Sequence, residues 1–200
     1  MHKNDSLLNQ LYKSSVKRNH AKNSGKIGEA RTNYMLDYLP EEKYIVLDNL
    51  LLKNDDITCQ IDHLVISAFG IFVIETKNYE GFFVGDNKNK YWYKYLGKER
   101  YQCLNPIVQN NGHIIFLSKL LKLNQNKFFN IVCIPSNAKL HIKNNGELCR
   151  FDNLLTKIIP HKEIIITNVL DILDIIIDAS SDDKEDLREH IDCIKDKYFN

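Results

Sequence analysis

The chain has 200 residues, of which 44% are hydrophobic and 26% charged, and these ordinary fractions predict one globular domain that buries a core without disulfides. A formal net charge of +1 excludes a surface that is basic all over, although residues 1–31 are basic and residues 160–200 are acidic. No apolar run is long enough to span a membrane, so no membrane partner is predicted.

The first elements are predicted from capping residues and apolar periodicity. Residues 1–23 are polar and basic and predict a loosely attached arm. Residues 24–39 predict a helix that Pro40 ends. Strands separated by turn residues are predicted next, over residues 44–52, 57–66 and 70–77.

The second half begins with a hairpin-like region over residues 79–101. Asn105 as the cap and Pro106 at the first position predict a second helix that runs to about residue 123. Further strands are predicted over residues 128–134, 139–142 and 164–167, and further helices over 153–159, 168–178 and 182–197. The core order of helix, three strands, helix and strand predicts an α/β fold with a central mixed sheet flanked by helices. Residues 136–200 are expected to complete this core or to pack on it.

Three charged side chains stand at the ends of two apolar strands. Glu75 and Lys77 share one face of their strand, because side chains alternate with a period of two. If the hairpin turn is centred between Ala68 and Phe69, Asp62 lies directly opposite Glu75, with Cβ atoms roughly 4.5–5.5 Å apart. Two carboxylates so placed repel each other unless a cation lies between them, so the register predicts a metal site.

Simpler interpretations exist for each charge taken alone. A carboxylate at a strand end is often solvated, and a nearby lysine often forms an ordinary ion pair. The joint pattern, with its register and its apolar flanks, favours a site. His63 alternates to the face opposite Asp62 and is predicted to be a structural histidine.

A set of short motifs occurs in a fixed order along the chain: Gly25-Lys26-Ile27-Gly28-Glu29, Gln60-Ile61-Asp62-His63-Leu64-Val65, Gly70-Ile71-Phe72-Val73-Ile74-Glu75-Thr76-Lys77, Trp92 and Asn105-Pro106-Ile107-Val108-Gln109. This ordered set resembles the NERD (nuclease-related) domain of the PD-(D/E)xK, restriction-endonuclease-like superfamily. The resemblance covers about residues 24–135, and Ile61 occupies the place of the family's proline before the first acid.

This resemblance implies a restriction-endonuclease-like core and a set of metal ligands. Asp62 and Glu75 match the metal-binding acids, and the backbone carbonyl of Thr76 would be a further ligand. Glu29 on the first helix matches an acid aimed at the same site and is a further candidate ligand. The implied cofactor is Mg²⁺, with Mn²⁺ able to substitute.

The implied activity is metal-dependent hydrolysis of DNA phosphodiester bonds. Lys77 matches the lysine that orients the attacking water and stabilises developing charge. Gln109 matches a helical glutamine close to the active centre of related nucleases. The spacing gives little reason to assign a role to His113, one helical turn later.

Residues 77–101 mix basic side chains with aromatic rings. Basic groups suit phosphates, and exposed rings can stack on unpaired bases. Trp92 and the pair Phe82-Phe83 are expected instead to pack on the sheet, and nothing in the pattern predicts sequence specificity. The predicted DNA contacts are Lys88, Lys90, Lys94, Lys98 and Arg100.

The main alternative function is a non-catalytic nucleic-acid-binding or interaction module with the same fold. The presence of all three core residues, Asp62, Glu75 and Lys77, argues against a decayed site. A protein-interaction role for the C-terminal helices and a homo-oligomer are also left open. Five scattered cysteines without metal-binding spacing favour a cytoplasmic protein, and a composition rich in Lys, Asn and Ile favours an A·T-rich bacterial or plasmid genome.

Overall fold

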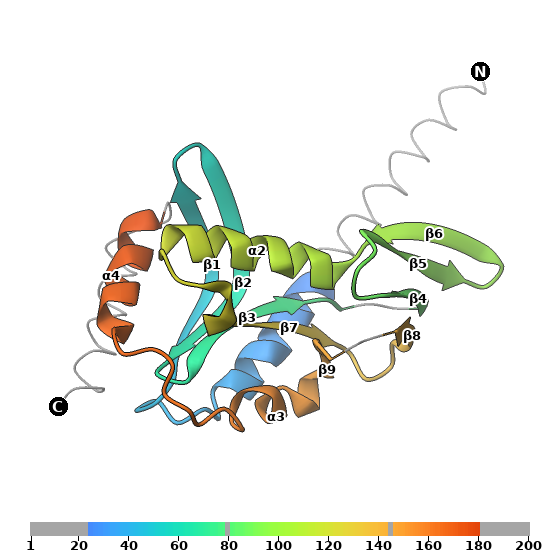
Figure 1. Ribbon diagram of the computed structural model, residues 1–200. Helices are drawn as coiled ribbons and strands as arrows, with labels where there is room; N and C mark the ends of the chain where they lie inside the picture. Colours follow the sequence, from blue (N-terminus) through green and yellow to red (C-terminus); the bar gives the residue numbers. More distant parts are fainter. Residues whose placement is uncertain (1–23, 79–80, 144–145, 181–200) are drawn as a thin grey trace, which may run out of the picture.

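The computed structural model describes residues 24–78, 81–143 and 146–180 (Figure 1). A helix covers residues 24–36. The main sheet has five strands in the order β1-β2-β3-β7-β9. Its strands are β1 (Ile45–Asn54), β2 (Ile57–Ser67), β3 (Gly70–Thr76), β7 (Phe128–Ile134) and β9 (Leu148–Arg150).

The main sheet is mixed, as predicted. β2 runs antiparallel to both β1 and β3, whereas β7 is parallel to β3 and β9 is parallel to β7. The return from β3 to β7 includes α2 (Pro106–Leu120), which crosses one face of the sheet (Figure 1). This arrangement is consistent with a restriction-endonuclease-like fold, and the predicted fold class is confirmed.

A second sheet of four strands, in the order β6-β5-β4-β8, lies beyond the end of β3, on the right of Figure 1. Its strands are β4 (Phe82–Asp86), β5 (Tyr91–Leu96), β6 (Glu99–Leu104) and β8 (Lys139–Lys143). The hairpin-like region that the sequence predicts forms three of these strands, and β8 adds to them in parallel from a distant part of the chain.

Both faces of the central strands are buried. Leu64 and Val73 face α2 in one hydrophobic cluster, whereas Val65 and Phe72 face helix 24–36 in another. Every residue of β3 is buried, so the strand that carries Glu75 is fixed from both sides. The remaining helices are α3 (Leu155–Ile158), α4 (Val169–Ala179) and the 3₁₀ turns η1 (Gln125–Lys127) and η2 (Phe151–Asn153).

Several element predictions need correction. Residues 164–167 form no strand; the N–H groups of Ile165 and Ile166 instead both donate to the carbonyl of Ala68, at 2.9 and 3.0 Å. The strand β9 was not predicted, and the predicted helix over 153–159 divides into η2 and α3. The predicted arm (1–23) and the predicted helix over 182–197 lie outside the described residues. None of the described helices is long and apolar enough to cross a membrane.

Candidate active site

The β2–β3 hairpin has the register that the turn position predicts. His63 pairs with Ile74, and Ser67 pairs with Gly70 across the turn. The pairing ends at His63 and Ile74, and Asp62 and Glu75 are the next residues along the two strands, on the face towards α2. There the Thr76 N–H donates to Asp62 Oδ2 at 2.9 Å, which fixes the Asp62 carboxylate at the end of the hairpin.

Four side chains converge on this point, and Glu75 is at their centre. Its carboxyl group is buried, with 1% of the residue exposed. The Lys77 ammonium forms an ion pair with Oε1, and the Gln109 amide donates to the same oxygen at 2.9 Å. His113 Nδ1 lies 3.5 Å from Oε2, and neither of these two atoms has a hydrogen-bond partner among the residues that the structure describes. Gln109 and His113 reach Glu75 together because they are one turn apart on α2.

The electrostatics of the site are set by a buried carboxyl group beside a second carboxylate. Burial raises the pKa of Glu75 to about 7, the Asp62 carboxylate adds to this rise, and Lys77 opposes it. Burial also lowers the pKa of His113, so this imidazole is neutral and does not offset the negative charge. A positive ion beside Oε2 would return the Glu75 pKa towards its ordinary range and would satisfy the unpaired oxygen.

The ligands available here are those of a hard cation. Among the described residues, no three His, Cys, Asp or Glu side chains converge closely enough to make a metal cage. Two carboxylates are present, and among the described residues no group donates a hydrogen bond to Glu75 Oε2. Mg²⁺ commonly takes one or two carboxylates and completes its coordination with water and substrate phosphate, so the residues fit this ion.

Helix 24–36 approaches the end of β3 from the opposite face of the sheet. A Cβ at Gly28 would lie 3.0 Å from the Thr76 methyl group and 3.1 Å from Asn78 Cβ, so any larger residue would require these neighbours to shift. The hydroxyls of Thr32 and Thr76 are hydrogen-bonded at 2.9 Å. Helix 24–36 therefore packs closely against the end of β3. Glu29 is half-buried on this helix, but within the described part of the chain it forms no hydrogen bond or ion pair with the residues around Glu75.

Two further polar residues have structural roles. His63 is buried, and its Nδ1 lies 2.7 Å from Asp48 Oδ1, as expected of a structural histidine. Asn110 was not singled out in the sequence, yet its amide donates to the Val73 carbonyl on β3 and the Ile131 carbonyl on β7, at 2.7 and 3.2 Å. These hydrogen bonds hold α2 against β3 and β7 and so fix the position along the sheet at which Gln109 contacts Glu75. A polar residue on the sheet-facing side of a helix is the signal that could have identified it.

The predicted DNA contacts lie on the second sheet rather than around the carboxylates. Of these residues, Lys94 is half-buried, and its Nζ lies 5.7 Å from the Phe83 ring centroid. Trp92 and Phe83 are fully buried, as expected, whereas Phe82 is 41% exposed and corrects the expectation that both phenylalanines pack inward. The exposed members of the predicted set are Lys88, Lys90, Lys98 and Arg100.

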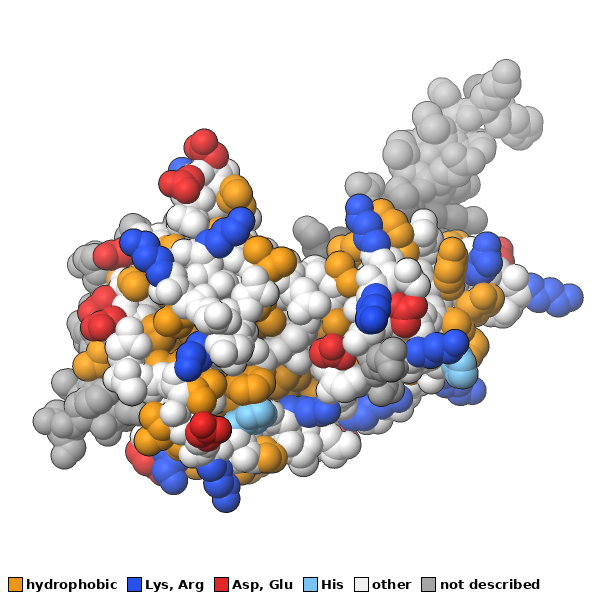
Figure 2. Space-filling view, in the orientation of Figure 1, with side chains coloured by type: hydrophobic (Ala, Val, Ile, Leu, Met, Phe, Trp, Pro, Cys, Tyr) orange, Lys and Arg blue, Asp and Glu red, His pale blue; other side chains and the backbone are white. Residues whose placement is uncertain are grey.

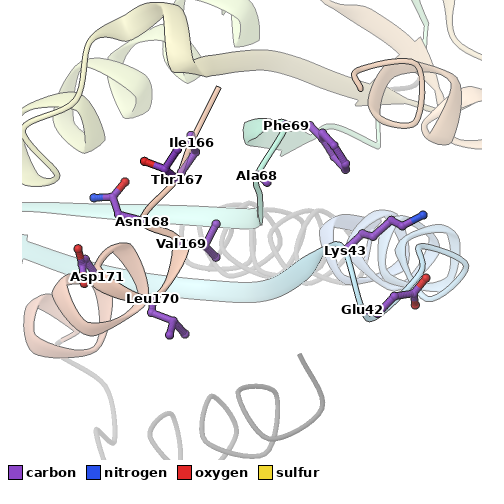
Figure 3. A pocket seen from close by; sticks show the side chains of 10 residues that line it. All are labelled: Glu42, Lys43, Ala68, Phe69, Ile166, Thr167, Asn168, Val169, Leu170 and Asp171. Atoms are coloured by element: carbon purple, nitrogen blue, oxygen red, sulfur yellow. The ribbon is translucent and has the colours of Figure 1, made fainter. Parts of the chain in front are cut away.

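A cavity of about 490 Å³ lies elsewhere, at the turn between β2 and β3 (Figure 3). Its walls include Phe69 from that turn and Ile166 to Asp171 from the segment that leads into α4. Glu75 is six residues further along β3, which corresponds to roughly 20 Å of strand. This cavity is therefore separate from the carboxylate site.

Comparisons with known proteins identify the family of this chain. The family model described as nuclease-related domain (NERD) matches residues 24–135, more than half of the chain, and includes all the residues that converge on Glu75. An uncharacterized protein of Bacillus anthracis is 31% identical over 192 residues, which cover 92% of this chain and 90% of that protein. No solved structure shows a significant match. The chain therefore belongs to the nuclease-related domain family.

Proposed function

We propose that this protein is a divalent-metal-dependent nuclease that hydrolyses DNA phosphodiester bonds at the site around Glu75. The single observation that carries this proposal is the burial of Glu75 next to Asp62, with an unpaired oxygen and with Lys77 on its other oxygen. A buried acid with a raised pKa and a specific charged partner is a typical feature of a functional site. A cytoplasmic location is part of the same proposal.

The expected ligands of the ion are the carboxylates of Asp62 and Glu75 and the backbone carbonyl of Thr76, with Glu29 as a further candidate. Bound Mg²⁺, or Mn²⁺ in its place, would lower the pKa of a bound water and neutralise charge on the scissile phosphate. The Thr76 N–H holds the Asp62 carboxylate in place, so one ligand is preorganised before an ion arrives.

Lys77 is the proposed catalytic cation of the chain. Its side chain is 26% exposed, so it contacts both Glu75 and solvent, where a substrate phosphate would lie. In this position it orients the attacking water and stabilises the charge that develops on the phosphate. Gln109 is a positioning residue, because its amide holds the Glu75 carboxyl rather than contacting substrate.

The test is DNA cleavage with matched variants. Plasmid and linear DNA are incubated with the protein in Mg²⁺, Mn²⁺ or EDTA, and Asp62→Ala and Lys77→Ala are compared with Asp56→Ala and Lys53→Ala. The two control residues are exposed in the β1–β2 hairpin. Cleavage is expected with metal only, and only in the wild type and the controls.

Equal cleavage by the Asp62→Ala and Lys77→Ala variants, or no cleavage under any condition, would contradict the proposal. DNA binding without cleavage in every metal would instead assign the chain to the alternative, a non-catalytic binding module.

A further inference from the structure

The four-stranded sheet has two chemically different faces. Its inner face packs against the start of α2 and against β7 through a cluster that includes Phe83, Trp92 and Ile107. Gly85 permits this packing, because a Cβ there would lie 2.3 Å from the Trp92 ring. The opposite face, called the outer face here, is not covered by any described element and presents aromatic and basic side chains.

The strand register aligns one row of four side chains across this outer face. Phe82 on β4 pairs with Tyr95 on β5 and with Lys139 on β8, and Tyr95 in turn pairs with Arg100 on β6. Paired residues share a face, and adjacent strands are about 4.8 Å apart, so the row spans roughly 14 Å. The row therefore reads basic, aromatic, aromatic, basic from one edge of the sheet to the other.

Ring contacts and side-chain exposures support this arrangement of the row. The rings of Phe82 and Tyr95 have their centroids 6.0 Å apart. Tyr93, in the next row, has the Arg100 guanidinium 4.6 Å from its ring centroid. Phe82 is 41% and Tyr93 38% exposed, and Lys139 and Arg100 are exposed. In Figure 2, hydrophobic and Lys/Arg side chains lie side by side over this sheet.

This chemistry fits a single-stranded nucleic acid. Exposed aromatic rings can stack only on bases that are not already stacked in a duplex, and flanking Lys and Arg suit phosphates. A flat sheet is also too wide to enter a duplex groove. A second copy of this chain is a poorer occupant, because two basic rows would face each other. The acid on this face, Asp86, is already engaged by the N–H groups of Lys88 and Asn89, at 2.8 and 2.7 Å.

The outer face is joined rigidly to the candidate active site. The Asn105 amide donates to the carbonyls of Asp86 and Asn89, at 3.1 and 2.7 Å, and its oxygen accepts the N–H of Ile107 at the start of α2. One turn of helix separates Asn105 from Gln109, which contacts Glu75. The sheet, the start of α2 and the carboxylate site are therefore held as one body.

We propose that the outer face of the four-stranded sheet binds single-stranded DNA by stacking bases on Phe82, Tyr93 and Tyr95 and by pairing phosphates with Lys139 and Arg100. A strand held there would be presented to the site at the end of β3. The presentation step rests on the proposed function, whereas the binding itself does not.

The test is fluorescence anisotropy with a labelled oligothymidylate of about 20 nucleotides and a duplex of the same length, in EDTA to prevent cleavage. Phe82→Ala and Tyr93→Ala are each expected to weaken single-strand binding by roughly 5- to 150-fold, since base–aromatic stacking contributes about 1–3 kcal/mol. Lys139→Ala is expected to weaken it and to reduce its dependence on salt.

Matched controls separate this surface from general effects. Tyr93→Phe keeps the ring and is expected to bind as the wild type does, which would show that the ring and not the hydroxyl is needed. Tyr38→Ala and Lys53→Ala remove an exposed ring and an exposed ammonium elsewhere and are expected to have no effect.

Unchanged single-strand affinity in Phe82→Ala and Tyr93→Ala would overturn the proposal, as would equal losses for single-stranded and duplex DNA. A dimer that dissociates in these variants, with no change in DNA affinity, would assign the face to a second copy instead. Because binding is measured without metal, its failure leaves the nuclease proposal intact, and an absence of cleavage leaves the binding result intact.

Discussion

Glu75 should make the stability of the metal-free protein fall as the pH rises. Below its ordinary pKa of 4.5 the group is protonated in both the folded and the unfolded chain and contributes no difference. Between 4.5 and about 7 the unfolded chain loses the proton while the folded chain retains it, so the free energy of unfolding decreases. Above about 7 the loss is complete and amounts to about 3 kcal/mol, because one pKa unit corresponds to about 1.4 kcal/mol.

The substitution Glu75→Gln removes this titration while it keeps the size of the side chain. The Lys77 side chain is 26% exposed, so its ammonium can then turn to solvent. The free energy of unfolding of the variant relative to the wild type should therefore increase by up to about 3 kcal/mol between pH 5 and pH 8.5.

Urea denaturation in EDTA at the two pH values measures this difference, with the fluorescence of the single tryptophan, Trp92, as the probe. Glu163→Gln, at an exposed position, is the matched control and should show no pH-dependent difference. A Glu75→Gln effect that is the same at pH 5 and pH 8.5 would refute the argument that burial keeps this carboxyl protonated.

Three further predictions concern the metal, the lysine and the first helix. Mg²⁺ should raise the melting temperature of the wild type but not of Asp62→Ala, and calorimetry in buffers of different ionisation enthalpy near pH 7 should detect a proton released on binding; no proton release would contradict the coupling. Lys77→Met should lower cleavage by at least about 10²-fold while DNA affinity in EDTA stays within a few fold, and a parallel loss of both would make Lys77 a binding residue instead. Gly28→Ala should destabilise the fold by about 1–3 kcal/mol in thermal or chemical unfolding, because the new methyl group meets Thr76 and Asn78 at 3.0 and 3.1 Å; a neutral effect would show that the helix can move away.

The parts of the site that the sequence predicted depend on short-range rules. The position of the turn at Ala68-Phe69 sets the hairpin register, and a shift of one residue would have moved Glu75 to the other face. The cap at Asn105 likewise sets the phase of α2, which brings Gln109 to Glu75. The turn alone therefore predicted the register, whereas the role of Gln109 was implied by the family resemblance, because a glutamine in the first turn of a helix is more often a surface residue.

The parts that were missed depend on distant pairing. β8 joins β4 in parallel although about fifty residues separate them, and β9 is a three-residue strand that forms only against β7. Residues 164–167 have the apolar character of a strand, but they pack against the β2–β3 turn instead. Two of their backbone N–H groups donate to one carbonyl of that turn, so no strand pairing forms. Phe82 was expected to pack inward because nothing local shows which face of the second sheet is covered.

Asn105 has a consequence for how this protein tolerates change. Its side-chain oxygen accepts a hydrogen bond from the first turn of α2, and its side-chain amide donates to two carbonyls at the loop between β4 and β5. Its backbone N–H donates to the Lys90 carbonyl at 3.0 Å. Aspartate lacks the donors and serine has only one, so neither can replace it without losing a bond. The tip of the β5–β6 hairpin, by contrast, has Gly97 with no atom within 4 Å of where a Cβ would stand. Insertions at that tip could lengthen the second sheet without moving Gln109. A substitution of Asn105 would instead disturb the β4–β5 loop and the start of α2 together.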